Sequence, residues 1–276
     1  MTYGYSLCDV MEIVECKNFL LSDQAEYIYI GSEFCDQYYV QTSTDLWEKC
    51  FKMVKEKRRQ GILVVPVPSQ KRLKKVKEKT DCILNTYGEW IQEIVGNDFA
   101  MLQWMTQISE KPLWCGRMLS KEPRDPRHIE QKQVSKLYER AENDMLFGVS
   151  VKGVEIDNVN LAKVHFANSC IAGIHVPYAY VSMSRICELG SIGYQIDQKF
   201  RLTNGCKRQC LSYYQEYTNK NIQFLKFGQA VYTNSQHLSE AILQNENIRI
   251  IYSAIFDWVR QSKEGSNEIT CSGNIS

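Results

Sequence analysis

No run of apolar residues in this sequence approaches the roughly 18 that a membrane-spanning helix needs, so we expect no membrane span. The segment 1–10 also lacks the basic region and the apolar stretch of a signal peptide, which predicts a cytoplasmic protein. A surplus of one charge sign is missing too, because 33 Lys and Arg face 32 Asp and Glu. Without a global field, a nucleic-acid or membrane partner would need a local basic patch and is not favoured.

Several motifs that would identify a catalytic class are also absent. No Gly-rich GxGxxG or P-loop signature follows a predicted strand, so nothing favours a dinucleotide or nucleoside triphosphate site. No HExxH motif or Ser-His-Asp arrangement is visible, which weakens a peptidase interpretation. The 11 cysteines in 276 residues fall well below the roughly 8–10% of a disulfide scaffold. In a reducing compartment, an odd number of cysteines predicts free thiols, a metal site or both.

What the sequence does contain is an alternation of short apolar runs with longer amphipathic or charged stretches. Runs rich in β-branched and aromatic residues indicate strands at 4–9, 26–31, 61–67, 81–85, 92–97, 111–116, 163–168 and 172–181. The intervening segments 44–59, 69–79, 98–109 and 129–145 read as helices, with Thr44 and Ser69 as N-caps and Asp98 as a cap or a site acid. This pattern predicts an α/β fold, a (β/α)8 TIM-like barrel that is complete, incomplete or distorted. An open doubly wound sheet is the alternative. We expect one barrel domain at 1–261 and a polar tail at 262–276.

The most informative segment holds three cysteines close together in the sequence. Cys206 and Cys210 are separated by the polar spacer Lys-Arg-Gln, and Cys187 precedes them. Thiolates at this density suit an iron–sulfur cluster or zinc, both of which prefer soft ligands. A fourth ligand must come from elsewhere in the chain. Cys35 is the best candidate because it follows the predicted strand 26–31, where α/β folds gather their sites, and Cys170 is the reserve.

Four elements, in this order, resemble the peptidase U32 family, also called collagenase-like proteases. Segment 27–35, YIYIGSEFC, is similar to the family's yIyiG-x-E-x-C element, and segment 96–102, GNDFAML, to its NDxGxL turn. Segment 115–119, CGRML, is similar to the GRxL element, and the later cysteines resemble the family's cysteine-rich segment. Together these elements cover residues 5–235, nearly the whole chain.

Within that family, the cysteine pattern resembles the branch of oxygen-independent hydroxylases that includes the paired proteins of anaerobic ubiquinone biosynthesis. The resemblance implies a 4Fe-4S cluster held by Cys35, Cys187, Cys206 and Cys210. It also implies a hydroxylase that takes oxygen from prephenate or a similar acid. The interval from Cys187 to Cys206 is longer here than in the quinone branch, which leaves the substrate open.

For the acid, Arg117 is the first candidate, since arginines in loops after barrel strands can fork onto a carboxylate. Arg127 is a second candidate, although it reads equally as a solvated loop charge, and Tyr178 is a candidate for the wall of an apolar pocket. His175 lies on an apolar segment and reads as a core histidine with satisfied hydrogen bonds.

Other functions within the same resemblance stay open. An RNA-base hydroxylase predicts that Lys71, Lys74 and Lys75 lie on the cluster's side of the molecule. A non-catalytic, cluster-bearing subunit would instead support a related protein, and either function allows a hetero-oligomer with a second U32-like chain. A peptidase is the remaining alternative from the family's historical name.

Overall fold

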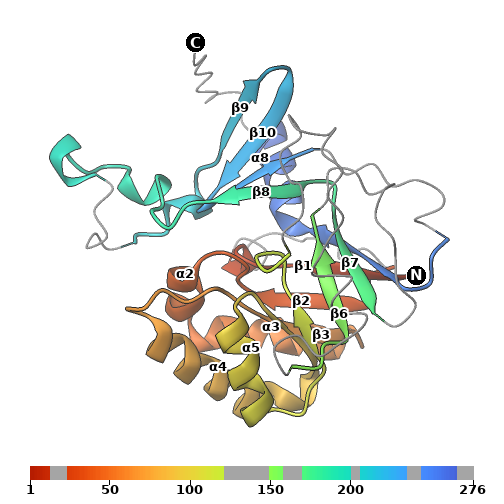
Figure 1. Ribbon diagram of the computed structural model, residues 1–276. Helices are drawn as coiled ribbons and strands as arrows, with labels where there is room; N and C mark the ends of the chain where they lie inside the picture. Colours follow the sequence, from red (N-terminus) through yellow and green to blue (C-terminus); the bar gives the residue numbers. More distant parts are fainter. Residues whose placement is uncertain (13–23, 121–148, 158–169, 200–205, 235–243, 266–276) are drawn as a thin grey trace.

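The computed structural model describes residues 1–12, 24–120, 149–157, 170–199, 206–234 and 244–265 (Figure 1). Eight parallel strands close into a barrel in the order β1-β12-β7-β6-β5-β4-β3-β2. They are β1 (Thr2–Ser6), β2 (Tyr27–Gly31), β3 (Gln60–Val65), β4 (Ile91–Gly96), β5 (Leu113–Cys115), β6 (Gly153–Ile156), β7 (Ile171–Val176) and β12 (Ile248–Ser253). With helices between the strands, this is a (β/α)8 TIM-like barrel, and the predicted fold class is confirmed.

Helices cover the outside of the barrel, where they protect the apolar outer faces of the strands (Figure 1). They are α2 (Asp36–Gln41), α3 (Thr44–Glu56), α4 (Leu73–Tyr87), a short 3₁₀ turn η1 (Gly88–Trp90) and α5 (Phe99–Ile108). Helix α8 (Ala254–Gly265) follows β12 and packs against the second sheet, where Trp258 contacts Phe227. The cap of α3 is Ser43 rather than the predicted Thr44, because the Ser43 hydroxyl accepts from the amide of Leu46. Asp98 caps α5, which decides between its two predicted roles.

A separate cluster of side chains fills the barrel interior. Successive side chains of a strand point to opposite faces, so each strand contributes alternate residues to this interior. Trp114 is the largest of them, and Gly153 on the neighbouring strand makes room for its ring, since a Cβ there would lie 2.5 Å from Trp114. The cluster consists of Cys8, Tyr29, Ile62, Val64, Val95, Trp114 and Ile251. The floor of the barrel mouth is therefore packed rather than open.

A second, antiparallel sheet, which was not expected from the sequence, stands over the barrel (Figure 1). Its strands run in the order β8-β11-β10-β9. They are β8 (Ala179–Met183), β9 (Gln215–Asn219), β10 (Ile222–Phe227) and β11 (Ala230–Thr233). Between β8 and β9, the described residues form the 3₁₀ turns η4 (Leu189–Ser191), η5 (Ile196–Gln198) and η6 (Gln209–Leu211). This segment carries the later cysteines.

Several predicted elements are wrong. Segment 81–85 belongs to α4 and not to a strand, because Val76, Thr80, Ile83 and Tyr87 are buried at helical spacing. The predicted strand 172–181 is two strands, β7 in the barrel and β8 in the second sheet, divided at Pro177. Helix α4 begins at Leu73, with Arg72 as its N-cap, so Ser69 is not its cap.

Strands β6 and β12 were not expected, and α8 extends to Gly265, into the predicted tail. The predicted strand 163–168 and helix 129–145 lie outside the described residues. Among the described residues, no helix is long and apolar enough to cross a membrane.

Candidate functional site

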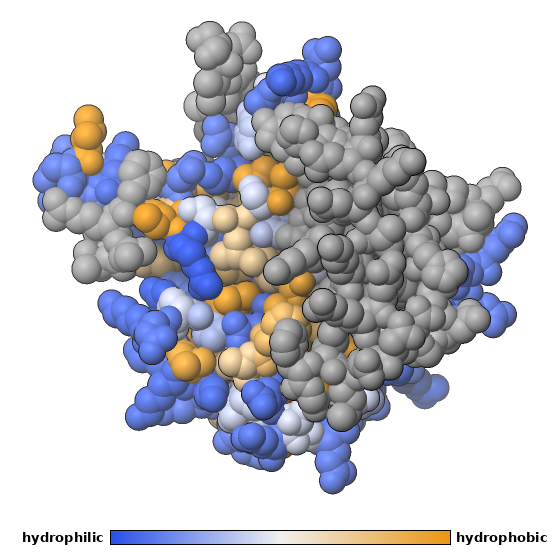
Figure 2. Space-filling model, in the orientation of Figure 1, coloured by the Kyte–Doolittle hydropathy of each residue, from blue (hydrophilic) through white to orange (hydrophobic). Residues whose placement is uncertain are grey.

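A cavity lies between the carboxyl end of the barrel and the second sheet. The space in it that a water-sized sphere can reach is about 110 Å³. In Figure 2, orange and pale residues gather in the middle of the face, between the helical part and the second sheet. The cavity is lined by Asp9, Phe34, Cys35, Gln37, Tyr38, Arg72, Arg185, Ile186, Cys187, Gly190, Ser191, Cys206, Cys210, Phe227, Gly228, Gln229 and Tyr232.

Cys35 reaches the cavity from the barrel side. It follows β2 and is the N-cap of α2, where its Sγ accepts from the amide of Tyr38 at 3.3 Å. The turn that carries it begins at Gly31, whose φ of +137° favours glycine. A Cβ at Gly31 would lie 2.1 Å from the carbonyl oxygen of Val64, so the close strand packing also requires glycine. This local geometry places the thiol at the carboxyl end of the barrel.

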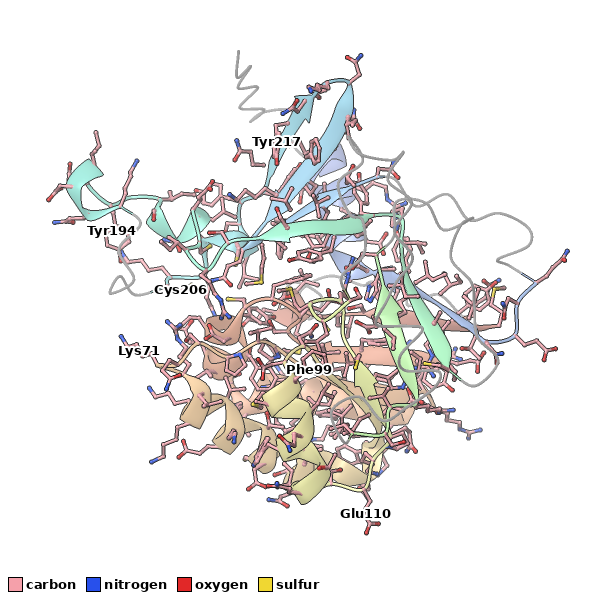
Figure 3. The ribbon with its side chains drawn as sticks, viewed as in Figure 1. Lys71, Phe99, Glu110, Tyr194, Cys206 and Tyr217 are labelled. Carbon is pink, nitrogen blue, oxygen red and sulfur yellow. The ribbon has the colours of Figure 1, made fainter. Side chains whose placement is uncertain are left out.

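The other three cysteines reach the cavity from the segment between β8 and β9. The Sγ of Cys187 accepts from the amide of Gly190 at 3.3 Å, and the Sγ of Cys206 accepts from the amide of Arg208 at 3.3 Å. Cys206 lies at the base of the projecting segment that carries Tyr194 (Figure 3). The structure thus brings all four predicted cysteines to one cavity, although Cys35 is far from the others in sequence.

The four thiols are also electrostatic neighbours. Burial raises the pKa of Cys35 well above its usual range, and charge on Cys210 or Cys206 would raise it further. Burial likewise raises the pKa of Cys187, and it raises the pKa of Cys210 to about 12, with Cys187 and Cys206 adding to the effect. The thiolate forms of Cys35, Cys187 and Cys210 are therefore disfavoured, and a bound cation would stabilise them.

These thiols are not arranged around a single point. Among the described residues, no three His, Cys, Asp or Glu side chains stand close enough to hold one metal ion. A single zinc ion needs its sulfurs at about 2.3 Å from one centre, whereas a cluster of several irons spreads its thiolate ligands more widely. The four cysteines share one cavity, but within the described residues they do not form an assembled site for either group.

Arg117 lies beneath the cavity, in the wall between the barrel and the second sheet. It is 1% exposed, its Nε donates to Asp157 at 2.7 Å, and its Nη1 donates to Glu33 at 3.0 Å. The guanidinium also lies 5.8 Å from the ring centre of Phe34 and 5.8 Å from that of Tyr232. Because two carboxylates already hold it, Arg117 joins β2, β5 and β6 at the carboxyl end of the barrel.

His175 and Glu155 lie in the same buried layer, and their polar atoms find few partners. The Nε2 of His175 is 3.3 Å from the nearer oxygen of Glu155, and its Nδ1 is 3.9 Å from Glu33. Neither side chain makes a hydrogen bond within the described part of the chain, although both are at most 1% exposed. His175 is therefore buried as expected, but the expectation of satisfied hydrogen bonds is wrong.

The remaining predicted residues lie elsewhere. Tyr178 stacks on Phe256 at 4.1 Å and borders a separate surface pocket beside Lys263. Arg127 lies outside the described residues. Cys170, the reserve ligand, is buried at the start of β7 and does not line the cavity.

Sequence reasoning missed Asp9, Arg72 and Arg185 as cavity residues. Asp9 follows β1, has a φ of 64°, and accepts from the Ser32 hydroxyl and from the amide of Glu33. Burial raises its pKa to about 7. Its place just after a barrel strand was a usable signal. Arg185 had none, because it reaches the cavity only through the second sheet.

The fold and the site together define a (β/α)8-barrel protein with a cysteine-lined cavity at the carboxyl end of its strands. No family model matches the sequence, and no curated protein matches it. The solved structure of the U32 peptidase Mk0906 aligns with 91% of this chain and 92% of its own, at a TM-score of 0.48 and 8% identity. A likeness at this level carries no argument about function.

Proposed function

We propose that this chain is a U32-type 4Fe-4S protein that catalyses or supports oxygen-independent hydroxylation of an organic substrate. Cys35, Cys187, Cys206 and Cys210 would hold the cluster. The observation that carries the proposal is the convergence of these four cysteines, from two distant parts of the sequence, on one cavity. A cavity at the carboxyl end of the strands is also where barrel enzymes build their active sites.

The cluster would supply or accept electrons, and the chain's own residues would bind and orient the substrate. Phe34, Tyr38, Phe227 and Tyr232 provide an aromatic wall for the apolar part of a ligand. A prephenate-like oxygen donor carries carboxylates, which require a cation. Arg117 is already held by Asp157 and Glu33. Arg72 and Arg185 line the cavity, so their guanidinium groups are the candidates for binding the carboxylates.

Of these two, Arg185 is better suited to hold an acid. Arg72 is paired with Asp36 at 3.3 Å, whereas Arg185 is exposed and has no ion pair among the described residues. Replacing Arg185 by Gln should weaken binding of prephenate by about tenfold, the loss of one charge-assisted contact. Titration calorimetry measures this, with Arg260→Gln on the distant helix α8 as a matched control. Equal affinity of Arg185→Gln and the parent protein would remove Arg185 from this role.

Anaerobic purification with iron and sulfide analysis tests the cluster itself. We expect a brown protein with about four iron and four sulfide per chain. Cys206→Ala and Cys210→Ala should abolish the colour. Cys50→Ala should keep it, because Cys50 is buried on α3, outside the cavity. One equivalent of zinc without labile sulfide would overturn the proposal.

An RNA-base hydroxylase is the second candidate, and one observation favours it. Arg72 lines the cavity, and Lys71 beside it lies on the same side of the molecule as Cys206 in Figure 3. Lys74 is less suited to this role because it pairs with Glu78 at 3.8 Å on the exposed face of α4. Salt-sensitive binding of transfer RNA that Lys71→Gln reduces would favour this candidate. Absence of binding at low salt would exclude it.

A further inference from the structure

We propose that Arg208 is a positioning residue that holds the later cysteines against Cys35. This inference rests on the proposed function only in naming the cluster as the group that the thiols hold. Arg208 lies in the spacer between Cys206 and Cys210, where the sequence alone indicates a solvated, polar linker. In the structure, the side chain of Arg208 joins this spacer to the barrel through hydrogen bonds and an ion pair.

The contacts of the guanidinium all lead to the barrel side of the cavity. Its Nη2 donates to the hydroxyl of Thr42 at 3.1 Å and to the carbonyl oxygen of Tyr38 at 3.4 Å. Its Nη1 forms an ion pair with Glu12, which follows β1. The guanidinium carbon also lies 5.0 Å from the ring centre of Tyr38. A single side chain therefore contacts α2 along its length and the loop after β1.

Arg208 is also linked to the thiols on the two sides of the cavity, directly to Cys206 and through Tyr38 to Cys35. Its backbone amide donates to the Sγ of Cys206, and its φ of 59° turns the chain so that Cys210 follows on the cavity side. At the other end, the amide of Tyr38 donates to the Sγ of Cys35. The path from Cys206 to Cys35 thus runs through Arg208 and Tyr38, with a weaker support from Gln41, which donates to the carbonyl oxygen of Cys206 at 3.5 Å.

The neighbouring cation provides a matched control. The ammonium of Lys207 lies 5.7 Å from the ring centre of Tyr194, on the projecting segment itself. Removing its charge changes the spacer by the same amount but breaks no contact with the barrel. Arg208→Gln keeps a non-glycine residue at the left-handed position, so the backbone preference there is unchanged. A difference between Arg208→Gln and Lys207→Gln therefore reports on the contacts of the guanidinium.

The first measurement needs no cluster. Metal-free protein is treated anaerobically with a short bismaleimide, and cross-linked peptides that join Cys35 to Cys206 or Cys210 are quantified by mass spectrometry. We expect Arg208→Gln to lower this yield by about tenfold, the loss of one charge-assisted contact, and Lys207→Gln to leave it unchanged. Glu12→Gln should lower it less, and this variant also keeps the test valid if Arg208→Gln folds poorly.

The second measurement uses anaerobically reconstituted protein. Arg208→Gln should retain less than half of the iron of the parent protein and show an altered electron paramagnetic resonance spectrum, while Lys207→Gln matches the parent. Unchanged cross-linking and full iron content in both Arg208→Gln and Glu12→Gln would overturn the inference and leave the cluster proposal intact. If the parent protein binds no iron but its cross-linking still depends on Arg208, the cluster proposal is wrong. The positioning role of Arg208 is then still supported.

Discussion

The two ends of the barrel both bury charged side chains, but they use them differently. At the amino end, Arg249 donates to Glu93 at 2.6 Å and to the Tyr29 hydroxyl at 3.2 Å. Lys152 approaches Glu93 from the surface at 2.5 Å. The guanidinium of Arg249 also lies 3.5 Å from the ring centre of Tyr27. This end is closed by a network in which each charge has an opposite partner, although the Nε of Arg249 makes no hydrogen bond within the described part of the chain.

At the carboxyl end, the charges are less evenly matched. Glu33 and Asp157 share the cationic Arg117, whereas His175 and Glu155 lie 3.3 Å apart and have polar atoms without a hydrogen bond in the described part of the chain. Buried polar groups without partners cost stability, and in native proteins they gather at functional sites. The comparison teaches that buried charge alone does not locate a site. The difference lies in whether the charge is satisfied.

Breaking the closed end should have the largest effect. Glu93→Gln leaves Arg249 buried without its carboxylate, so we expect the free energy of unfolding to fall by about 3–5 kcal/mol. Chemical denaturation followed by circular dichroism measures this. A loss below 1 kcal/mol would show that the network at this end is not structural.

The same pair has a pH signature. Burial would raise the pKa of Glu93, but Arg249 and Lys152 overcome this effect and lower it. An acid with a lowered pKa in the folded state stabilises the fold above its unfolded pKa, which is about 4.3 for Glu. This contribution is lost as the pH falls through the lower, folded value. The parent protein should therefore lose more stability than Glu93→Gln as the pH falls below about 4.

Breaking the cysteine set should have the next largest effect, and only in the loaded protein. A metal site that joins early and late parts of the chain binds only the folded arrangement and so stabilises it. Cys35→Ala should reduce the iron content from about four per chain to below one and lower the unfolding temperature by roughly 5 °C. Cys170→Ala should keep the full iron content, because its thiol lies outside the cavity. Iron retained by Cys35→Ala but lost by Cys170→Ala would exchange the two assignments.

A smaller change is expected where the closed end meets solvent. The side chain of Lys152 is 41% exposed, so water and salt screen its pairing with Glu93. Lys152→Gln should reduce the free energy of unfolding by about 0.2–1 kcal/mol, with the difference shrinking at high salt. A loss as large as that of Glu93→Gln would mean that Lys152, and not Arg249, balances the buried carboxylate.

The smallest change in the free energy of unfolding is expected from a variant at the carboxyl end of the barrel. This variant tests directly whether the two ends differ. The carboxylate of Glu155 is buried and accepts no hydrogen bond within the described part of the chain. Glu155→Gln removes a desolvated charge, so the metal-free protein should stay within about 1 kcal/mol of the parent or become more stable. Denaturation curves of Glu155→Gln and Glu93→Gln, recorded side by side, measure the contrast. Equal destabilisation by the two variants would erase the distinction between the ends.

Much of the outer frame could be predicted from local patterns. Helices α3 and α5 follow from the spacing of their apolar residues, whereas Asp98 was predicted only as a cap or a site acid and the structure shows it as the cap of α5. Strand β2 and its trailing Cys35 were found because an apolar run with a following cysteine lies within nine residues, 27–35. By contrast, 81–85 has the composition of a strand but the spacing of a helix, and a short window does not separate the two.

The sequence by itself determined the βα alternation and the paired spacing of Cys206 and Cys210, because these are properties of neighbouring residues. The closed barrel was the favoured fold, and the structure decided for it against an open sheet. Only the tertiary structure decided that Arg117 is held by two carboxylates, that His175 makes no hydrogen bond with the described residues, and that Arg208 reaches across to α2. The second sheet belongs to the same category, since its strands pair only after the chain has returned over the barrel mouth. The physical reason is that long-range packing selects the partners of buried charges and of the added antiparallel strands. The spacing of neighbouring residues carries no information about such partners.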